Sequence, residues 1–175
     1  MGGIDIIISN VGAMDLGTTR QPWEKNFNLD VMGLVNLVET GEPFLEEAAR
    51  EHGDAAVIAI SSTAAAAISS AQSYGAVKAA LIHYVKGLAK NFAGRKIRAN
   101  TVAPGMVYFE GGIWDHIEQE NPEGFNAALA KNPMGRMAVP QDVANAVAFL
   151  SSPCASFISG INMVVDGAMT DRVNY

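Results

Sequence analysis

Tyr74 and Lys78, four residues apart, are the two side chains of this sequence best suited to proton chemistry. Residues i and i+4 of an α-helix lie on one face, so the ammonium group can approach the phenol. An unperturbed phenol has a pKa of about 10, and a nearby cation favours the phenolate and lowers that value. The spacing predicts an acid/base pair. Taken alone, it also fits an exposed helical pair worth about a few tenths of a kcal/mol.

Ser61 and Ser62 end a predicted strand shortly before Tyr74. A hydroxyl at this position can polarise a substrate carbonyl, although a Ser-Ser pair after a strand is commonly a turn or a cap. The spacing to Tyr74 leaves either serine open as the functional one.

Four short β-branched apolar runs predict the strands that position these residues, each followed by a turn signal. They cover 4–9, 55–61, 97–103 and 161–165. Helical patterns lie between them: one begins near Pro22 and is kinked or interrupted at Pro43, one covers 73–92, and one begins near Pro140. The alternation predicts an α/β fold with a doubly wound parallel sheet, in a single domain over 1–175. Ligands of such sheets bind beyond the carboxyl ends of the strands.

The segment 107–137 is long for a connection between a strand and a helix, and it contains several aromatic residues. Long excursions at the ligand-binding edge are often substrate lids. A surface helical hairpin that packs its own aromatic side chains is the equal alternative.

The ordered motifs resemble those of the short-chain dehydrogenase/reductase family over essentially the whole chain, and the general pattern is similar to its 3-oxoacyl-acyl-carrier-protein reductase-like branch. The segments that carry the resemblance are 4–12 (IDIIISNVG), 60–62 (ISS), 74–80 (YGAVKAA), 97–105 (IRANTVAPG), 133–136 (PMGR) with 140–144 (PQDVA), and 157–160 (FISG) with 164–167 (VVDG). The resemblance implies the C-terminal part of a Rossmann-type sheet, with four strands and flanking helices.

The resemblance also implies roles and partners. Tyr74 would exchange a proton with the substrate oxygen, Lys78 would hold the nicotinamide ribose, and Ser62 (or Ser61) would bind the carbonyl oxygen. Lining residues for the cofactor, NAD or NADP, would be Asn10, Gly12, Pro104, Gly105 and Val107, together with Tyr74 and Lys78. The substrate would be a small carbonyl or secondary alcohol, and the protein a homo-oligomer, either a dimer or a tetramer.

Two features depart from the family pattern. Asp30 stands where the family usually has the asparagine of a proton relay, and an ionised aspartate only accepts hydrogen bonds. It would either keep the relay or pair directly with Lys78. The second departure is that no strand and glycine-rich turn precede the first strand, so the chain is expected to lack the part that grips the pyrophosphate. The edge and one apolar face of that strand are expected to be uncovered.

The composition of the chain argues against several classes of function. A net charge of −6 with no basic cluster argues against nucleic acid and anionic membranes as partners. One cysteine and no targeting segment fit a cytoplasmic protein. The three histidines lack ligand spacing, so no metal site is expected.

Two functional hypotheses follow. The first is an oxidoreductase that moves hydride between NAD(P) and a carbonyl or secondary alcohol. The alternative is a truncated remnant with no catalysis and no cofactor binding. An upstream reading frame encoding a strand and a glycine-rich turn would favour the first.

Overall fold

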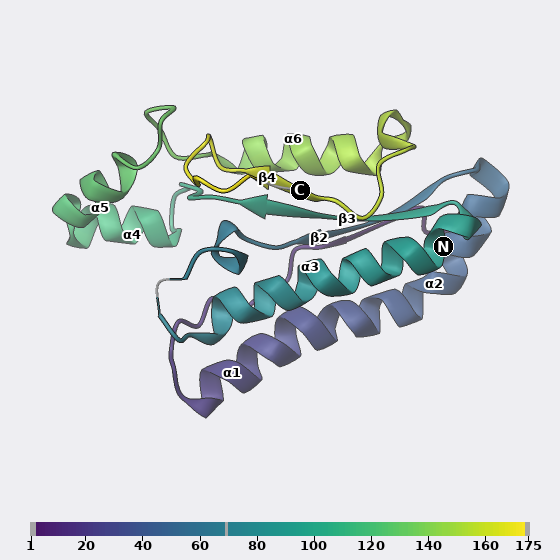
Figure 1. Ribbon diagram of the computed structural model, residues 1–175, viewed down its shortest axis with the longest axis horizontal. Coiled ribbons are helices and arrows are strands. Elements are labelled where there is room, and N and C mark those ends of the chain that lie inside the picture. The colour runs from purple at the N-terminus through teal and green to yellow at the C-terminus, as the bar shows by residue number, and fades with distance from the viewer. Residues whose placement is uncertain (1–2, 69, 174–175) are drawn as a thin grey trace.

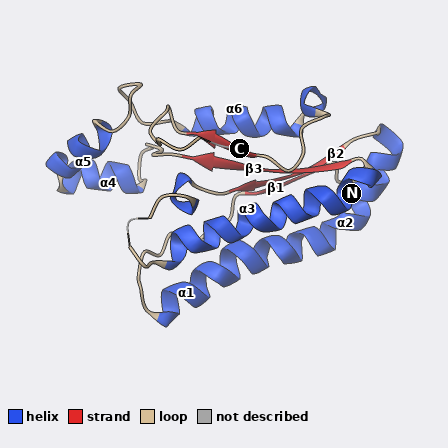
Figure 2. Ribbon diagram, viewed as in Figure 1, coloured by secondary structure: helices blue, strands red, loops and turns tan. Residues whose placement is uncertain are grey.

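The computed structural model describes residues 3–68 and 70–173 and shows one parallel sheet flanked by helices (Figures 1 and 2). Its strand order is β1-β2-β3-β4, and every neighbouring pair is parallel. The strands are β1 (Ile6–Ser9), β2 (Ala55–Ile60), β3 (Ile97–Pro104) and β4 (Asn162–Val165). All four predicted strands are confirmed to within two residues at each end.

Burial differs between the central strands and β1. β2 and β3 are buried along almost their whole length, as continuous apolar runs predict for strands covered on both faces. β1 alternates instead: Ile7 is buried, whereas Ile6 and Ile8 are 44% and 48% exposed. Among the described strands β1 pairs only with β2, so its other edge is free. The expected uncovered apolar face is therefore present.

The helices form two layers, one on each side of the sheet (Figure 1). The first layer contains α1 (Arg20–Asn26), a π-helical turn (Phe27–Met32), α2 (Gly33–His52) and α3 (Ser73–Phe92). The apolar faces of α2 and α3 pack on side chains of β1, β2 and β3 around a core that includes Leu34, Val57 and Leu81, and α1 lies against α3. The second layer is α6 (Pro140–Ser151), which packs Val147 and Leu150 against Ile58 and Val102.

Of the two effects expected at Pro43, a kink or an interruption, the interruption is wrong. α2 runs through Pro43 without a break from Gly33 to His52. A proline in a helix interior removes one hydrogen bond and crowds the preceding turn. On either side of it, Leu34, Val38 and Leu45 are almost fully buried in the core. Tertiary packing of this face therefore outweighs the local cost of the proline.

Two short helices form a hairpin beyond the carboxyl ends of the strands (Figure 1). They are α4 (Ile113–Glu120) and α5 (Pro122–Leu129). Single 3₁₀ turns occur at Thr63–Ala65, Ala93–Arg95 and Pro153–Ala155. None of the helices in the described part of the chain is long and apolar enough to cross a membrane.

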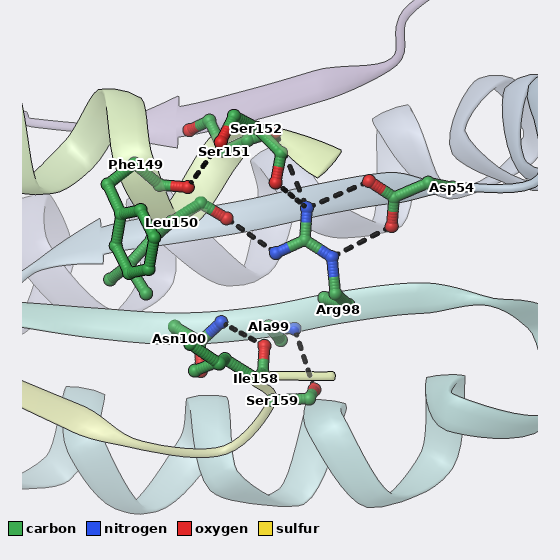
Figure 3. A network of polar contacts seen from close by, with 10 residues as sticks. All are labelled: Asp54, Arg98, Ala99, Asn100, Phe149, Leu150, Ser151, Ser152, Ile158 and Ser159. Atoms are coloured by element: carbon green, nitrogen blue, oxygen red, sulfur yellow. Dashed lines mark hydrogen bonds and ion pairs between the residues drawn. The ribbon is translucent and has the colours of Figure 1, made fainter. Parts of the chain in front are cut away.

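Arg98 lies at the opposite end of the sheet, near the start of β3 (Figure 3). Its guanidinium donates to both carboxylate oxygens of Asp54, at 2.8 and 2.9 Å. It also donates to the backbone carbonyls of Leu150, Ser151 and Ser152 at the end of α6. These bonds satisfy carbonyls that a helix end leaves without partners, and they fasten α6 to β3.

Candidate active site

A cavity of about 300 Å³ lies where β1, β2 and β3 end. It collects residues from the turns after these strands, from the first turns of α3 and from the hairpin segment. Its lining residues are Asn10, Gly12, Ala13, Met14, Ile60, Ser61, Ser62, Tyr74, Lys78, Pro104, Gly105, Val107, Phe109, Ile113 and Trp114. Of the site residues predicted from the sequence, all except Asp30 line this one cavity, and Asp30 lies directly behind it.

Tyr74 and Lys78 stand on the first two turns of α3, on the face that the helix spacing predicts. The Lys78 Nζ atom lies 5.7 Å from the centroid of the Tyr74 ring. It donates a hydrogen bond to the backbone carbonyl of Ile60, at 3.1 Å, where β2 ends. Only 6% of Lys78 is exposed, so little water screens its charge.

Asp30 is the counter-ion of Lys78. Its Oδ1 atom lies 2.7 Å from Lys78 Nζ, and its Oδ2 atom accepts a hydrogen bond from the Ala13 backbone at 2.8 Å. Asp30 is 1% exposed and lies in the π-helical turn, a widened turn of the kind that often occurs at functional sites. Of the two alternatives left open by the sequence, the structure has the direct pair.

Gly12 makes room for this ion pair. A Cβ atom at this position would lie 2.9 Å from Asp30 Oδ1 and 3.0 Å from Lys78 Nζ. Both distances are shorter than van der Waals contact, so a larger residue would press on the pair. The turn that follows β1 is thus fitted to the buried charges.

The two serines have different surroundings. Ser61 is buried, and its hydroxyl donates to the Lys78 backbone carbonyl at 2.9 Å, which ties β2 to α3. The Ser62 hydroxyl accepts from the Ala64 backbone at 3.1 Å, so its own proton is available to a cavity ligand. This geometry favours Ser62 as the hydroxyl that meets a substrate oxygen.

Asn26 is a buried polar residue that the sequence reasoning missed. Its amide donates to the Asp15 backbone carbonyl at 2.8 Å and to the Ser73 hydroxyl at 2.7 Å. It therefore joins the segment after β1 to the start of α3, next to Tyr74. The signal in the sequence is its spacing: Asn26, Asp30 and Leu34 recur every four residues on one inward face.

The carboxyl end of β3 forms another wall of the cavity. A Cβ atom at Gly105 would lie 2.8 Å from Cβ of Asp166, so glycine permits the close approach of two chain segments. Val107 then forms an isolated parallel bridge with Ala138. A second, more apolar hollow of about 840 Å³ adjoins this wall and is lined by Ile6 and Ile8, on the uncovered face of β1.

The segment 107–137 has a feature that each interpretation of its sequence requires, and its movement as a lid stays a prediction. Tyr108 packs edge-on against Phe125, with ring centroids 5.9 Å apart, as a self-packed hairpin requires. Trp114 nevertheless lines the cavity, as a lid requires. The Tyr108 hydroxyl donates to Glu118 at 2.6 Å, and this hydrogen bond raises the pKa of Tyr108 to about 12.

Known proteins of similar sequence are reductases and dehydrogenases by name. Residues 1–170 match the family model described as enoyl-(acyl carrier protein) reductase. The chain is 38% identical over 171 residues to an isoepoxydon dehydrogenase of Penicillium expansum, a match that covers 97% of this chain and 64% of that protein. It is 31% identical over 171 residues to a 3-oxoacyl-[acyl-carrier-protein] reductase of Vibrio cholerae, a match that covers 96% of this chain and 67% of that protein.

A solved structure has the same arrangement of elements. An oxidoreductase of the short chain dehydrogenase/reductase family from Burkholderia thailandensis superposes with a TM-score of 0.83 at 30% identity, over 94% of this chain and 64% of that one. The chain spans about 64% of the length of the isoepoxydon dehydrogenase that it matches.

Proposed function

Since the chain belongs to the short-chain dehydrogenase/reductase family, we propose that its cavity is the catalytic centre of an NAD(P)-dependent oxidoreductase acting on a carbonyl or secondary alcohol. The observation that supports the proposal most strongly is the meeting of Tyr74, Lys78 and Ser62 in one cavity at the carboxyl ends of the strands. An acid, a cation and a hydroxyl donor are the groups that such a reaction requires around one oxygen atom.

Each of the three side chains has a distinct task in this proposal. Ser62 donates its hydroxyl proton in a hydrogen bond to the substrate oxygen. Tyr74 gives its phenolic proton to that oxygen as a carbonyl becomes an alcohol, and takes the proton back in the reverse direction. Lys78 favours the phenolate form of Tyr74 through its positive charge.

The residues at the cavity fit the nicotinamide end of NAD or NADP. Lys78 has three N–H groups; it donates one to the Ile60 carbonyl, and its charge is paired with that of Asp30. It therefore retains N–H groups for ribose hydroxyls, next to the wall formed by Asn10 and Gly105. When bound, the coenzyme supplies or accepts the hydride.

The cavity also indicates the kind of substrate. The apolar part of its lining consists largely of Met14, Phe109, Ile113 and Trp114. Among the described lining residues, Tyr74 and Lys78 are the only ones with ionisable side chains. We therefore propose a compact and largely apolar substrate without a charge of its own. The name of the 38% identical relative, isoepoxydon dehydrogenase, agrees with a small-molecule substrate.

The outer face of the long α1–α2 segment supports assembly into a homo-oligomer. Leu37 and Phe44 are 41% and 43% exposed, and their spacing of seven residues places them on one face of α2. An interface between copies would remove these apolar side chains from water. Light scattering should give a dimer or a tetramer, and a monomer would contradict this assignment.

Substitution of Tyr74 by Phe tests the proposed function. In the intact protein, Tyr74→Phe removes the proton donor and should lower kcat by about 10³-fold, within the range for general acid–base catalysis. Coenzyme affinity, measured by fluorescence titration, should change little, because Lys78 still binds the ribose. The substrate panel should contain small cyclic and aromatic ketones with both NADH and NADPH.

Tyr84→Phe is the matched control. Tyr84 lies on the same helix, and it packs against the core rather than lining the cavity. Loss of the Tyr84 hydroxyl should leave kcat within about twofold of the wild-type value. Equal turnover in wild type and Tyr74→Phe would overturn the assignment.

A further inference from the structure

We propose that Asp30 is a positioning residue whose negative charge sets the pH range in which the Tyr74–Lys78 pair works. The inference rests on the proposed function, because it concerns the acid/base pair of that reaction. It starts from the buried contact between Asp30 and Lys78, 2.7 Å between Oδ1 and Nζ, and from the 1% exposure of the carboxylate.

Both carboxylate oxygens of Asp30 face hydrogen-bond donors. Oδ1 faces the Lys78 ammonium, and Oδ2 accepts from the Ala13 backbone at 2.8 Å. An asparagine in the same rotamer would turn its NH₂ group towards one of these donors. Oδ1 has no hydrogen-bond partner in the described part of the chain, so its contact with the ammonium is one of opposite charges, which a carboxylate provides and an amide does not.

The charge of Asp30 has a direct consequence for the acid/base pair. Tyr74 and Lys78 interact, so the proton that leaves first belongs to the pair as a whole. A nearby negative charge makes the loss of a positive charge from that pair harder, whichever of the two groups releases the proton. Removal of the carboxylate should consequently make that loss easier, and the pH profile of turnover reports the change.

No other ionisable side chain lines the cavity in the described part of the chain. Tyr74 and Lys78 come from α3, and the walls from β1, β2, β3 and the hairpin segment contribute uncharged residues. Behind the cavity, Asp30 contacts Lys78 from the π-helical turn. Asp15 belongs to the segment after β1 and pairs with Lys25 at 3.5 Å, with both side chains partly exposed.

The test is the pH profile of kcat for alcohol oxidation, in which the pair must first be deprotonated. In Asp30→Asn, the half-maximal point of the acid limb should move to lower pH by about one unit. Asp30→Glu keeps the charge, and its acid limb should stay at the wild-type pH even if kcat falls. An unchanged limb in Asp30→Asn, or an equal shift in both variants, would overturn the inference.

Asp15→Asn is the matched control, because it removes the same charge from a partly exposed pair. Its acid limb should coincide with that of the wild type, since water screens the charge. If Asp30→Asn does not fold, Asp30→Ser removes the charge from a smaller side chain and leaves space for a water molecule. The same shift is expected in this variant, and an unshifted limb would again refute the inference.

These results are distinguishable from a failure of the proposed function. If the function is wrong, the wild type has no turnover that depends on Tyr74, and no acid limb exists to compare. If only the inference is wrong, turnover depends on Tyr74 while removal of the Asp30 charge leaves the acid limb in place.

Discussion

Two buried cations lie at opposite ends of the sheet and have different surroundings. Arg98, 4% exposed, directs its guanidinium at Asp54 and at three carbonyls of the α6 end (Figure 3). Lys78, 6% exposed, has Asp30 and one backbone carbonyl as partners, and it lines a cavity. The arginine has five acceptor atoms around its guanidinium, whereas the lysine has two and lies at a cavity that can hold a ligand.

The difference separates a structural ion pair from the one to which we assign a function. Desolvation of a charge is costly, so a buried cation persists only where acceptors offset that cost. At Arg98 the acceptors come from the residue before β2 and from a helix end, which fixes those elements in place. At Lys78 the acceptors are fewer, and the side chain lines a cavity in which a ligand can reach it. Burial alone does not distinguish the two cations, but the number of partners does.

Replacing Lys78 should have the largest effect, and it should appear in turnover. Lys78→Met removes the charge that favours the Tyr74 phenolate and the donor for the ribose. We expect kcat/KM to fall by about 10³-fold or more. The variant also leaves Asp30 buried without a cation, which should lower the free energy of unfolding.

A double variant separates these two effects. Lys78→Met combined with Asp30→Asn removes the uncompensated charge, so the urea midpoint should recover relative to Lys78→Met alone. Turnover should stay low. Recovery of turnover together with stability would show that Lys78 is structural, and the contrast with Arg98 would then be lost.

Replacing Arg98 should affect stability and leave catalysis almost unchanged. Arg98→Met leaves Asp54 and the α6 carbonyls without their donor, which should cost about 3 kcal/mol of unfolding free energy. Urea denaturation measures this loss. kcat per folded molecule should remain within about twofold, since the arginine lies at the far end of the sheet from the cavity. A kcat loss as large as that of Lys78→Met would contradict the comparison.

The sequence predicted much of this arrangement, for physical reasons that differ from element to element. The central strands were found because continuous β-branched runs stay buried on both faces, as in β2 and β3. The Tyr74–Lys78 approach followed from helix geometry. The direct contact of Asp30 with Lys78 stayed open, because it depends on how two helical segments far apart along the chain are placed by the sheet.

Other features could not be predicted from the local sequence pattern. The continuation of α2 through Pro43 depends on the burial of Val38 and Leu45, and that burial results from tertiary packing. The role of Asn26 depends on partners in two other segments, Asp15 and Ser73. The π-helical turn before α2 has no simple sequence signature, although it contains Asp30.

An exposed ion pair, Arg136–Asp142, gives the smallest expected effect and sharpens the contrast with the two buried cations. Arg136 donates to Asp142 at 2.6 and 3.2 Å, and Val139 donates its backbone N–H to the same carboxylate at 2.8 Å at the start of α6. The Arg136 guanidinium first, and then this backbone bond, lower the pKa of Asp142 below its usual value of 3.8. Solvent screens such a pair, so Asp142→Asn should lower the melting temperature by only about 1–2 °C near neutral pH.

The sign of the pH dependence follows from the direction of that pKa shift. A carboxyl whose pKa is lower in the folded state stabilises the fold above its unfolded pKa, and this contribution is lost as the pH falls through the folded value. The melting-temperature gap between wild type and Asp142→Asn should therefore be constant above about pH 5 and should close as the pH falls below about 4. Asparagine keeps an acceptor for the Val139 N–H, so a gap that persists at low pH would mean that capping geometry, rather than charge, stabilises the start of α6.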